Sequence, residues 1–396
     1  MTMLDGIRVL SFNHFLLGPM GMQVLGDLGA DVIAVEPVGG GFQRKWSGAN
    51  RRADGESLLH LCANRNKRNI AIDLKSEEGK EVVHRLIAKS DVICENFRPG
   101  VMDKFGFGYE DAKVINTGVI YASASGYGGD GPYRERPGQD LVVQAMSGLA
   151  MINGNDQQAP VPVGVSAVDH HGAQILAMAI LAALVRRGRT GEGCRVEVDL
   201  LSAGLDIQCE SLVCWANGEP VSLRPPVNIA GWYYSAPYGI YETADGHMAI
   251  SLGTMKTLAT AIDLPELADF SDAETFSRKR EIAALIQTQV AGWSNDEIEA
   301  RLEAQSLWYA RVNDYAAVMT DPQVVHNGSF MTVDGANGEP ITLLGHPARY
   351  DGERPGVRRP PQPIGAQTAE VLGEIGYDDA AIAAMAGAGS IAVSGS

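Results

Sequence analysis

The first part of the chain alternates between short apolar runs and helical patterns, and this alternation constrains the fold most strongly. Residues 7–12 and 31–36 are β-like runs, with a helical pattern at 18–28 between them. Further β-like runs lie at 69–74, 91–95 and 119–123, and a helical pattern at 77–88. Repeated strand–helix–strand units place parallel strands in one sheet with helices on its faces. The sequence therefore predicts an α/β fold with a Rossmann-like parallel sheet.

The pattern changes in the second half of the chain. Residues 139–151 and 169–187 are predicted to be buried helices, and 194–200 a strand. The stretch 218–226 is rich in proline and is predicted to be a linker. Beyond it, β-like runs at 239–242 and 248–252 and a helix at 295–304 indicate a smaller α+β unit over residues 238–312. The last clear helix is expected at 368–375, before a tail rich in glycine and alanine.

Composition excludes several classes of function. The formal net charge is −16, which makes nucleic acid a poor partner. The five cysteines are scattered and the eight histidines lack metal-ligand spacing, so neither a disulfide framework nor a metal site is expected. No apolar run reaches 18 residues and no signal peptide is recognisable, so we expect a cytoplasmic protein without a membrane segment.

Charge is distributed unevenly along the chain. Residues 1–104 carry a net charge of +1, with 14 Lys/Arg and 13 Asp/Glu, whereas the remaining residues carry a net −17. Unless this unevenness is accidental, an anionic small ligand should bind mainly through the N-terminal quarter. A nicotinamide dinucleotide is not favoured as that ligand. The turn after the first strand supplies only Gly18 and Gly21 of the G-x-G-x-x-G fingerprint, although Glu36 stands where a ribose-binding acid belongs.

Asp169 begins a long apolar helix and has two interpretations. Aspartate is among the commonest helix N-caps, and position alone favours that role. The apolar helix also suggests a buried start, where the positive end of the helix would hold a partly shielded carboxylate in its ionised form. Such a carboxylate is suited to nucleophilic catalysis.

Several segments, taken together in their order, resemble the class III, formyl-CoA transferase-type CoA-transferases. The segments are 4–10, 28–33, 66–75, 95–100, Asp169 with its helix, 189–193, 241–246, 321–323 and 370–372. The resemblance covers nearly the whole chain and implies a CoA-transferase that forms an interlocked homodimer. It further implies a large Rossmann-like domain from residues 1–217 and 313–396, a linker at 218–237 and a small α+β domain inserted at 238–312.

The resemblance also implies roles for particular residues. Asp169 would be the nucleophile and Asp140 an acidic group beside it, although Asp140 is equally well explained as a helix cap. Backbone donors for the oxyanion are expected at the start of the Asp169 helix and near Gly231. Coenzyme A would be bound by Ile72, Asp73, Leu74, Lys75, Asn96, Phe97, Arg98 and Lys104. Lys75, Arg98 and Lys104 are suitable phosphate partners, and the alternative for each is a solvated surface cation.

The chain departs from the family pattern in places that bear on its substrate. Leu16 replaces a glutamine, Pro37 replaces an arginine that contacts CoA, and no tetraglycine loop is present. The nearest region, 228–236, carries Trp232, Tyr233 and Tyr234 instead. These differences favour an acyl group larger than formyl or oxalyl, and succinyl-CoA or another dicarboxylyl-CoA is the expected donor.

Two other functions are possible on the same pattern. A 2-methylacyl-CoA racemase needs two acid/base groups around the α-carbon, but Gln139 replaces the histidine of its His/Asp pair. His170 and His171 follow Asp169 directly and are expected to point away. A non-catalytic CoA-binding protein is the remaining alternative, against which the retained Asp169 speaks.

Overall fold

The computed structural model describes residues 3–218 and 224–394. Residues 219–223 of the predicted linker therefore lie outside the described residues. The chain divides into two compact units. One consists of Met1–Val143, Ser166–Gly204 and Pro322–Ser396, and the other of Gln144–Val165 and Leu205–Asp321. The predicted domain limits, and the small domain as an insertion, stay predictions.

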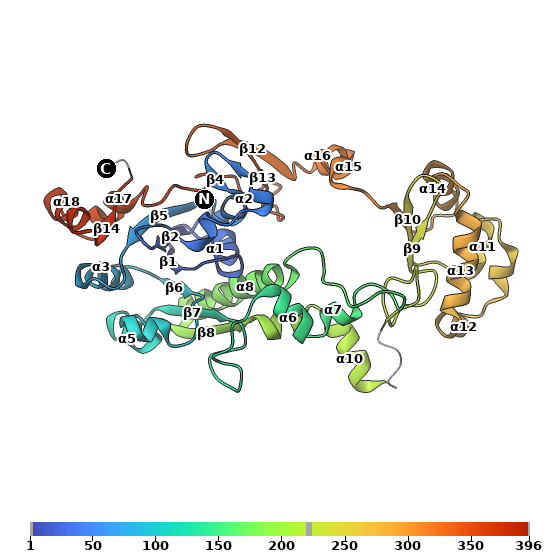
Figure 1. Ribbon diagram of the computed structural model, residues 1–396, viewed down its shortest axis with the longest axis horizontal. Helices are drawn as coiled ribbons and strands as arrows, with labels where there is room; N and C mark the ends of the chain where they lie inside the picture. Colours follow the sequence, from blue (N-terminus) through green and yellow to red (C-terminus); the bar gives the residue numbers. More distant parts are fainter. Residues whose placement is uncertain (1–2, 219–223, 395–396) are drawn as a thin grey trace. The chain divides into compact units, whose positions relative to one another are not determined.

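The first unit is built on a seven-stranded sheet. Its strands, from edge to edge, are β14 (Ile391–Ala392), β5 (Lys67–Ile72), β2 (Asp31–Glu36), β1 (Arg8–Phe12), β6 (Val92–Glu95), β7 (Ile120–Ser125) and β8 (Cys194–Asp199). All neighbours are parallel except β14, which pairs antiparallel with β5. The predicted α/β fold with a mainly parallel sheet is confirmed (Figure 1).

The strand order identifies where a ligand can bind. From β1 the chain builds outward through β2 and β5 on one side, and then through β6, β7 and β8 on the other. The direction of winding therefore reverses between β1 and β6. In open parallel sheets, the loops at the carboxyl ends of the strands diverge at such a switch point and leave a crevice.

Alternating side chains cover the two faces of the sheet. Leu10, Ile33, Ile70 and Ile93 share one buried face, where they pack with α3 (Glu77–Ala88) and other helices in the main core. The opposite face is covered by α1 (Leu17–Asp27) and α8 (Ala167–Thr190), which pack on each other.

The crossing of α1 and α8 is close because glycines lie in it. A Cβ atom at Gly172 would come within 2.7 Å of Leu17 Cδ1, and one at Gly21 within 3.0 Å of the Ala173 carbonyl oxygen. The small residues therefore bring the first turns of both helices together at the carboxyl edge of the sheet.

Helix α8 is long and apolar, with a mean hydropathy of 1.4, so by length and composition alone it could cross a membrane. It packs against α1, β7 and β8, as a core helix of a soluble protein also would. Met178 and Val185 on another part of the helix are 63% and 56% exposed. The helix therefore keeps apolar side chains that the described residues of this chain do not cover.

Shorter elements complete the first unit. Its remaining helices, two of them shared with the second unit, are α2 (Leu58–Ala63), α4 (Val101–Phe105), α5 (Tyr109–Ile115), α6 (Asp140–Met146), α9 (Leu200–Asp206), α16 (Pro322–His326), α17 (Thr368–Glu374) and α18 (Asp379–Ala388). Two hairpins are formed by β3 (Arg52–Ala53) with β4 (Glu56–Ser57) and by β12 (Phe330–Asp334) with β13 (Pro340–Leu344).

Two predictions about local structure are wrong. The single helix expected at 139–151 is divided into α6 and α7 (Leu149–Ile152), because Gly148 takes a left-handed conformation with φ +90°. The helix expected at 368–375 is not the last one, because the glycine- and alanine-rich tail forms α18 and β14. Alanine is the strongest helix former, and the Asp378 carboxylate accepts a hydrogen bond from the Ala381 N–H at 2.8 Å, which caps α18.

The second unit has its own sheet and core. Antiparallel β9 (Gly239–Glu242), β10 (His247–Ile250) and β11 (Tyr309–Arg311) form the sheet. Besides α7, its helices include α10 (Cys209–Asn217), α11 (Met255–Ala261), α12 (Asp272–Ser277), α13 (Lys279–Val290), α14 (Asn295–Ala304) and α15 (Tyr315–Thr320). Tyr241, Met248, Leu258 and Ile286 are buried in its core.

Candidate active site

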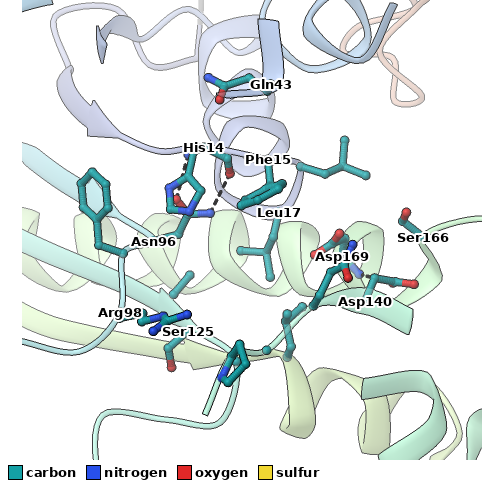
Figure 2. Close-up of a pocket in the computed structure, with 18 of the residues that line it drawn as sticks. His14, Phe15, Leu17, Gln43, Asn96, Arg98, Ser125, Asp140, Ser166 and Asp169 are labelled. Atoms are coloured by element: carbon teal, nitrogen blue, oxygen red, sulfur yellow. Dashed lines mark hydrogen bonds between the residues drawn. The ribbon is translucent and has the colours of Figure 1, made fainter. Parts of the chain in front are cut away.

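A cavity of about 490 Å³ lies at the carboxyl edge of the large sheet. Its walls come from the loops after β1, β6, β7 and β8, the start of α8, the segment 134–140 and the turn η1 (Phe42–Arg44). All of these belong to the first unit. The cavity therefore occupies the crevice expected at the switch point between β1 and β6 (Figure 2).

Asn96 connects the two loops that diverge at the switch point. Its Oδ1 accepts a hydrogen bond from the His14 N–H, and its Nδ2 donates to the His14 carbonyl oxygen, both at 2.8 Å. The Phe97 ring lies 5.3 Å from the His14 ring, and burial lowers the pKa of His14. Asn96 and Phe97 therefore fix the shape of the cavity wall, whatever ligand they contact.

Asp169 is not the N-cap of its helix. Helix α8 begins at Ala167, so Asp169 is its third residue. The cap is supplied by Asp140, whose Oδ1 accepts hydrogen bonds from the N–H groups of Val168 at 2.8 Å and Asp169 at 3.0 Å. No described residue donates a hydrogen bond to the Asp169 carboxylate, which lines the cavity beside Asp140 (Figure 2). Asp140 is therefore a helix cap, although the helix that it caps lies far along the sequence. Asp169 is not a cap.

The Asp140 cap changes the expected electrostatics. Burial, and after it the negative charge of Asp140, raises the pKa of Asp169 to about 7. The helix start therefore stabilises the ionised form of Asp169 less than expected, because Asp140 takes the positive end of the helix. The expected oxyanion donors at the start of α8 are wrong for Val168 and Asp169, whose N–H groups are occupied. A carboxylate that titrates near neutrality is still substantially ionised there and only weakly solvated, which suits a nucleophile.

Three arginines line the cavity, of which sequence analysis found only Arg98. Arg134 and Arg136 lie in the loop that leads to Asp140. The Arg136 guanidinium is 4.1 Å from the centre of the Tyr133 ring. The presence of Arg134 and Arg136 a few residues before Asp140 could have predicted an anion-binding loop from the sequence.

Gly126 and Gly138 close the base of this arginine-bearing loop, residues 127–137. A Cβ atom at Gly138 would lie 2.4 Å from Gly126 Cα, and one at Gly126 would lie 2.6 Å from Gly138 Cα. The two backbones are therefore in contact, and neither position has room for a side chain.

The structure separates the predicted CoA residues into two groups. Asn96, Phe97 and Arg98 line the cavity together with Asp140 and Asp169. The other group does not line it: Ile72, Asp73, Leu74, Lys75 and Lys104.

The second group lies close to the same edge of the sheet. Ile72 is buried at the end of β5 opposite Ile391 of β14, and Lys75 is exposed just beyond that strand. Leu74 and Phe97 pack on the same core cluster, and Lys104 is exposed on α4. The binding roles of both groups stay predictions.

Most cations of the N-terminal quarter that are buried have partners within the protein. Arg44 pairs with Glu36 at 2.8 Å and Arg65 with Asp27 at 2.5 Å. The Lys67 ammonium donates to the carbonyl oxygens of Pro19 and Ala63 and to Asn64 Oδ1. Each of these ion pairs is neutral as a whole and leaves the net charge of residues 1–104 unchanged, so the anion site predicted there stays a prediction. The same pairing occupies Glu36, the acid that a ribose would have needed.

Comparison with known proteins identifies the family. A family model described as CoA-transferase family III matches residues 4–368. The chain belongs to CoA-transferase family III.

Relatives and solved structures agree with this assignment. The human succinyl-CoA:glutarate CoA-transferase is 32% identical over 98% of this chain and 90% of its own length. A succinate–glutarate CoA-transferase from Agrobacterium fabrum is also 32% identical, over 94% of this chain and 95% of its own. The crystal structure of a CAIB/BAIF family protein from Brucella suis has a TM-score of 0.82 at 31% identity and covers 94% of this chain and 99% of its own. The racemase alternative is not favoured.

Proposed function

We propose that Asp169 is the nucleophile of this CoA-transferase. The observation that carries the proposal is the position and hydrogen bonding of its carboxylate. It faces the cavity, accepts no hydrogen bond from a described residue, and is held by a main chain that the Asp140 cap fixes in place. Asp140 is then a positioning and charge-tuning residue, because its own carboxylate is directed at the helix start.

The proposed reaction has two acyl exchanges on the same carboxylate. An oxygen of Asp169 attacks the donor thioester, which gives an aspartyl–acyl anhydride and releases CoA thiolate. The thiolate attacks the aspartyl carbonyl carbon, which gives an Asp169–CoA thioester and frees the donor acid. The acceptor carboxylate attacks this thioester to form a new anhydride, and the released thiolate then attacks the acceptor's acyl carbon and restores Asp169. Each step exchanges one acyl bond for another.

The arrangement of the cavity supports a direction for the substrate. Figure 2 shows Asn96 and Arg98 well apart from the Asp140–Asp169 pair. We place the thioester at Asp169 and the CoA arm toward Asn96, Phe97 and Arg98. Cations near the same edge of the sheet include Arg134, whose exposed ion pair with Glu135 at 3.1 Å is weak enough for a phosphate to replace.

Two further parts of the proposal concern the substrate and the assembly. The named activities of the human and Agrobacterium relatives support a dicarboxylyl-CoA such as succinyl-CoA as the donor and a dicarboxylate as the acceptor. The exposed apolar residues of α8, Met178 and Val185, support a homodimer in which a second copy covers them. We propose the interlocked form of that dimer.

Trapping the covalent intermediate tests the mechanism. The protein is incubated with succinyl-CoA and glutaryl-CoA, treated with hydroxylamine or borohydride, and analysed by peptide mass spectrometry. We expect modification at Asp169 in the wild type, none in Asp169→Asn, and an unchanged result in Asp5→Asn, which alters an exposed carboxylate of the same unit. Exchange of the α-proton without any adduct would overturn the proposal and restore the racemase.

A further inference from the structure

One part of the cavity wall is not used by the proposed reaction. It is formed by Phe15, Phe42, Trp46 and Leu59. The ring centres of Phe15 and Phe42 are 5.5 Å apart, and those of Phe42 and Trp46 are 6.5 Å apart. This aromatic wall holds one uncharged polar side chain of the turn η1, Gln43, which Figure 2 shows apart from the Asp140–Asp169 pair.

The side-chain amide of Gln43 is largely buried, with its Oε1 fully enclosed, and has no hydrogen-bond partner among the described residues. Gln43 is only 5% exposed, and its Oε1 has no partner among the described residues. Its Nε2 donates to none of them either. A buried amide that forms no hydrogen bond is unfavourable, and proteins keep such groups rarely and usually for a reason.

Neighbouring residues leave space for this amide and anchor the main chain around it. A Cβ atom at Gly41 would lie 2.5 Å from Gln43 Nε2 and 2.6 Å from Oε1, so the amide occupies space that only glycine leaves free. Gly41 has φ −74°, and its glycine is therefore not required by the backbone conformation. The Gly41 N–H donates to Glu36 at 2.8 Å, and Arg44 pairs with the same carboxylate. Both neighbours of the Phe42–Gln43 dipeptide are thus anchored.

The local charges indicate what this amide can bind. The nearest cation in sequence, Arg44, is paired with both Glu36 and Glu56, so it is not available to a ligand anion. An amide offers one acceptor and a donor group, and the partner that complements it is an uncharged group that also donates and accepts.

We propose that Gln43 binds an uncharged polar group of the acyl-CoA, an amide or a hydroxyl. The pantetheine arm of CoA carries such groups, and so do acyl chains with a hydroxyl. The proposal rests on the proposed function only in taking an acyl-CoA as the ligand of this cavity.

Binding to a variant that cannot react tests the proposal separately from the mechanism. Titration calorimetry measures Kd for butyryl-CoA and 3-hydroxybutyryl-CoA in an Asp169→Asn background, with and without Gln43→Met, which keeps the length of the side chain and removes its hydrogen bonds. We expect Kd to rise about five- to tenfold, the effect of one buried neutral hydrogen bond. An equal rise for both thioesters assigns the contact to pantetheine, and a rise confined to the hydroxylated thioester assigns it to the acyl chain.

Stability separates a binding role from a structural one. Since Met removes a buried amide without partners, Gln43→Met should unfold at the same temperature as the parent or higher, even though its Kd rises. Gly41→Ala should weaken binding in the same way, because it displaces the amide. Gln157→Met, at an exposed position of the second unit, serves as the matched control. An unchanged Kd for both thioesters in Gln43→Met, or a Kd that rises only together with a loss of stability, would overturn the proposal.

Discussion

Asp140 combines two effects that substitution can separate: it caps α8 and it raises the pKa of Asp169. Asparagine caps helices as well as aspartate does, so Asp140→Asn should keep the cap and remove the charge. Asp140→Ala should remove both. The pKa of Asp169 rises from 3.8 to about 7, with burial as the larger cause. The share of Asp140 is therefore less than half of that rise, about one pKa unit or about 1.4 kcal/mol.

The sign of the stability effect follows from proton linkage. Because the pKa of Asp169 is raised by folding, the folded protein binds more protons than the unfolded chain between pH 4 and 7. Stability therefore falls as the pH rises through that window. Asp140→Asn should reduce this loss of stability, so its free energy of unfolding at pH 8 should exceed that of the wild type by about 1 kcal/mol. Asp140→Ala also loses the cap, and should be about 1–2 kcal/mol less stable than Asp140→Asn.

Urea unfolding at pH 5 and pH 8 measures the stabilities, and single-turnover formation of the Asp169 adduct measures reactivity against pH. In the wild type the adduct should form faster as the pH rises through about 7. In Asp140→Asn the midpoint of this pH–rate curve should move to about pH 6. Equal stabilities of the Asn and Ala variants would refute the cap, and an unmoved midpoint would refute the charge coupling.

Three further outcomes are expected. Asp169→Asn should reduce transfer by a factor on the order of 10³ or more in steady-state assays, and its urea midpoint should decrease less than that of the wild type as the pH rises from 4 to 7. Arg98→Ala and Arg134→Ala should raise KM for acyl-CoA about tenfold with little change in kcat, and the rise should shrink for pantetheine thioesters, which lack the nucleotide. Glu36→Gln leaves the buried Arg44 without its main partner and should cost about 3–5 kcal/mol in urea unfolding; a cost below 1 kcal/mol would contradict the assigned pairing.

Local signals in the sequence predicted the regular elements well. The bounds of β2, α3 and α14 are those expected from the sequence, because apolar periodicity and capping serines define them. Ser76 caps α3, and Ser294 forms a capping box with Glu297. The break at Gly148 was missed because the pattern of apolar residues continues through it. A glycine at that position is compatible both with a continuous helix and with the left-handed conformation that ends one.

The candidate site was predicted only in part. Resemblance to a family pointed to Asp169, and the cavity brings it together with residues 96–98 and Asp140. The function of Asp140 as a cap joins residues 28 and 29 positions apart, for which no local pattern exists. A charge count likewise cannot tell a paired cation from a free one, because ion pairs such as Arg65 with Asp27 form only after the chain is folded.

The contact between Gly126 and Gly138 has a consequence for how this enzyme can change. Main chain makes the Gly126–Gly138 contact, and beside it the Tyr127 hydroxyl donates to the Pro137 carbonyl oxygen at 3.4 Å, so residues 128–136 can vary without removing either contact. Asp140 lies two residues after Gly138 and remains bound to the start of α8. A change in the sequence or length of this loop therefore replaces the anion-binding side chains Arg134 and Arg136 without moving the carboxylate of Asp169.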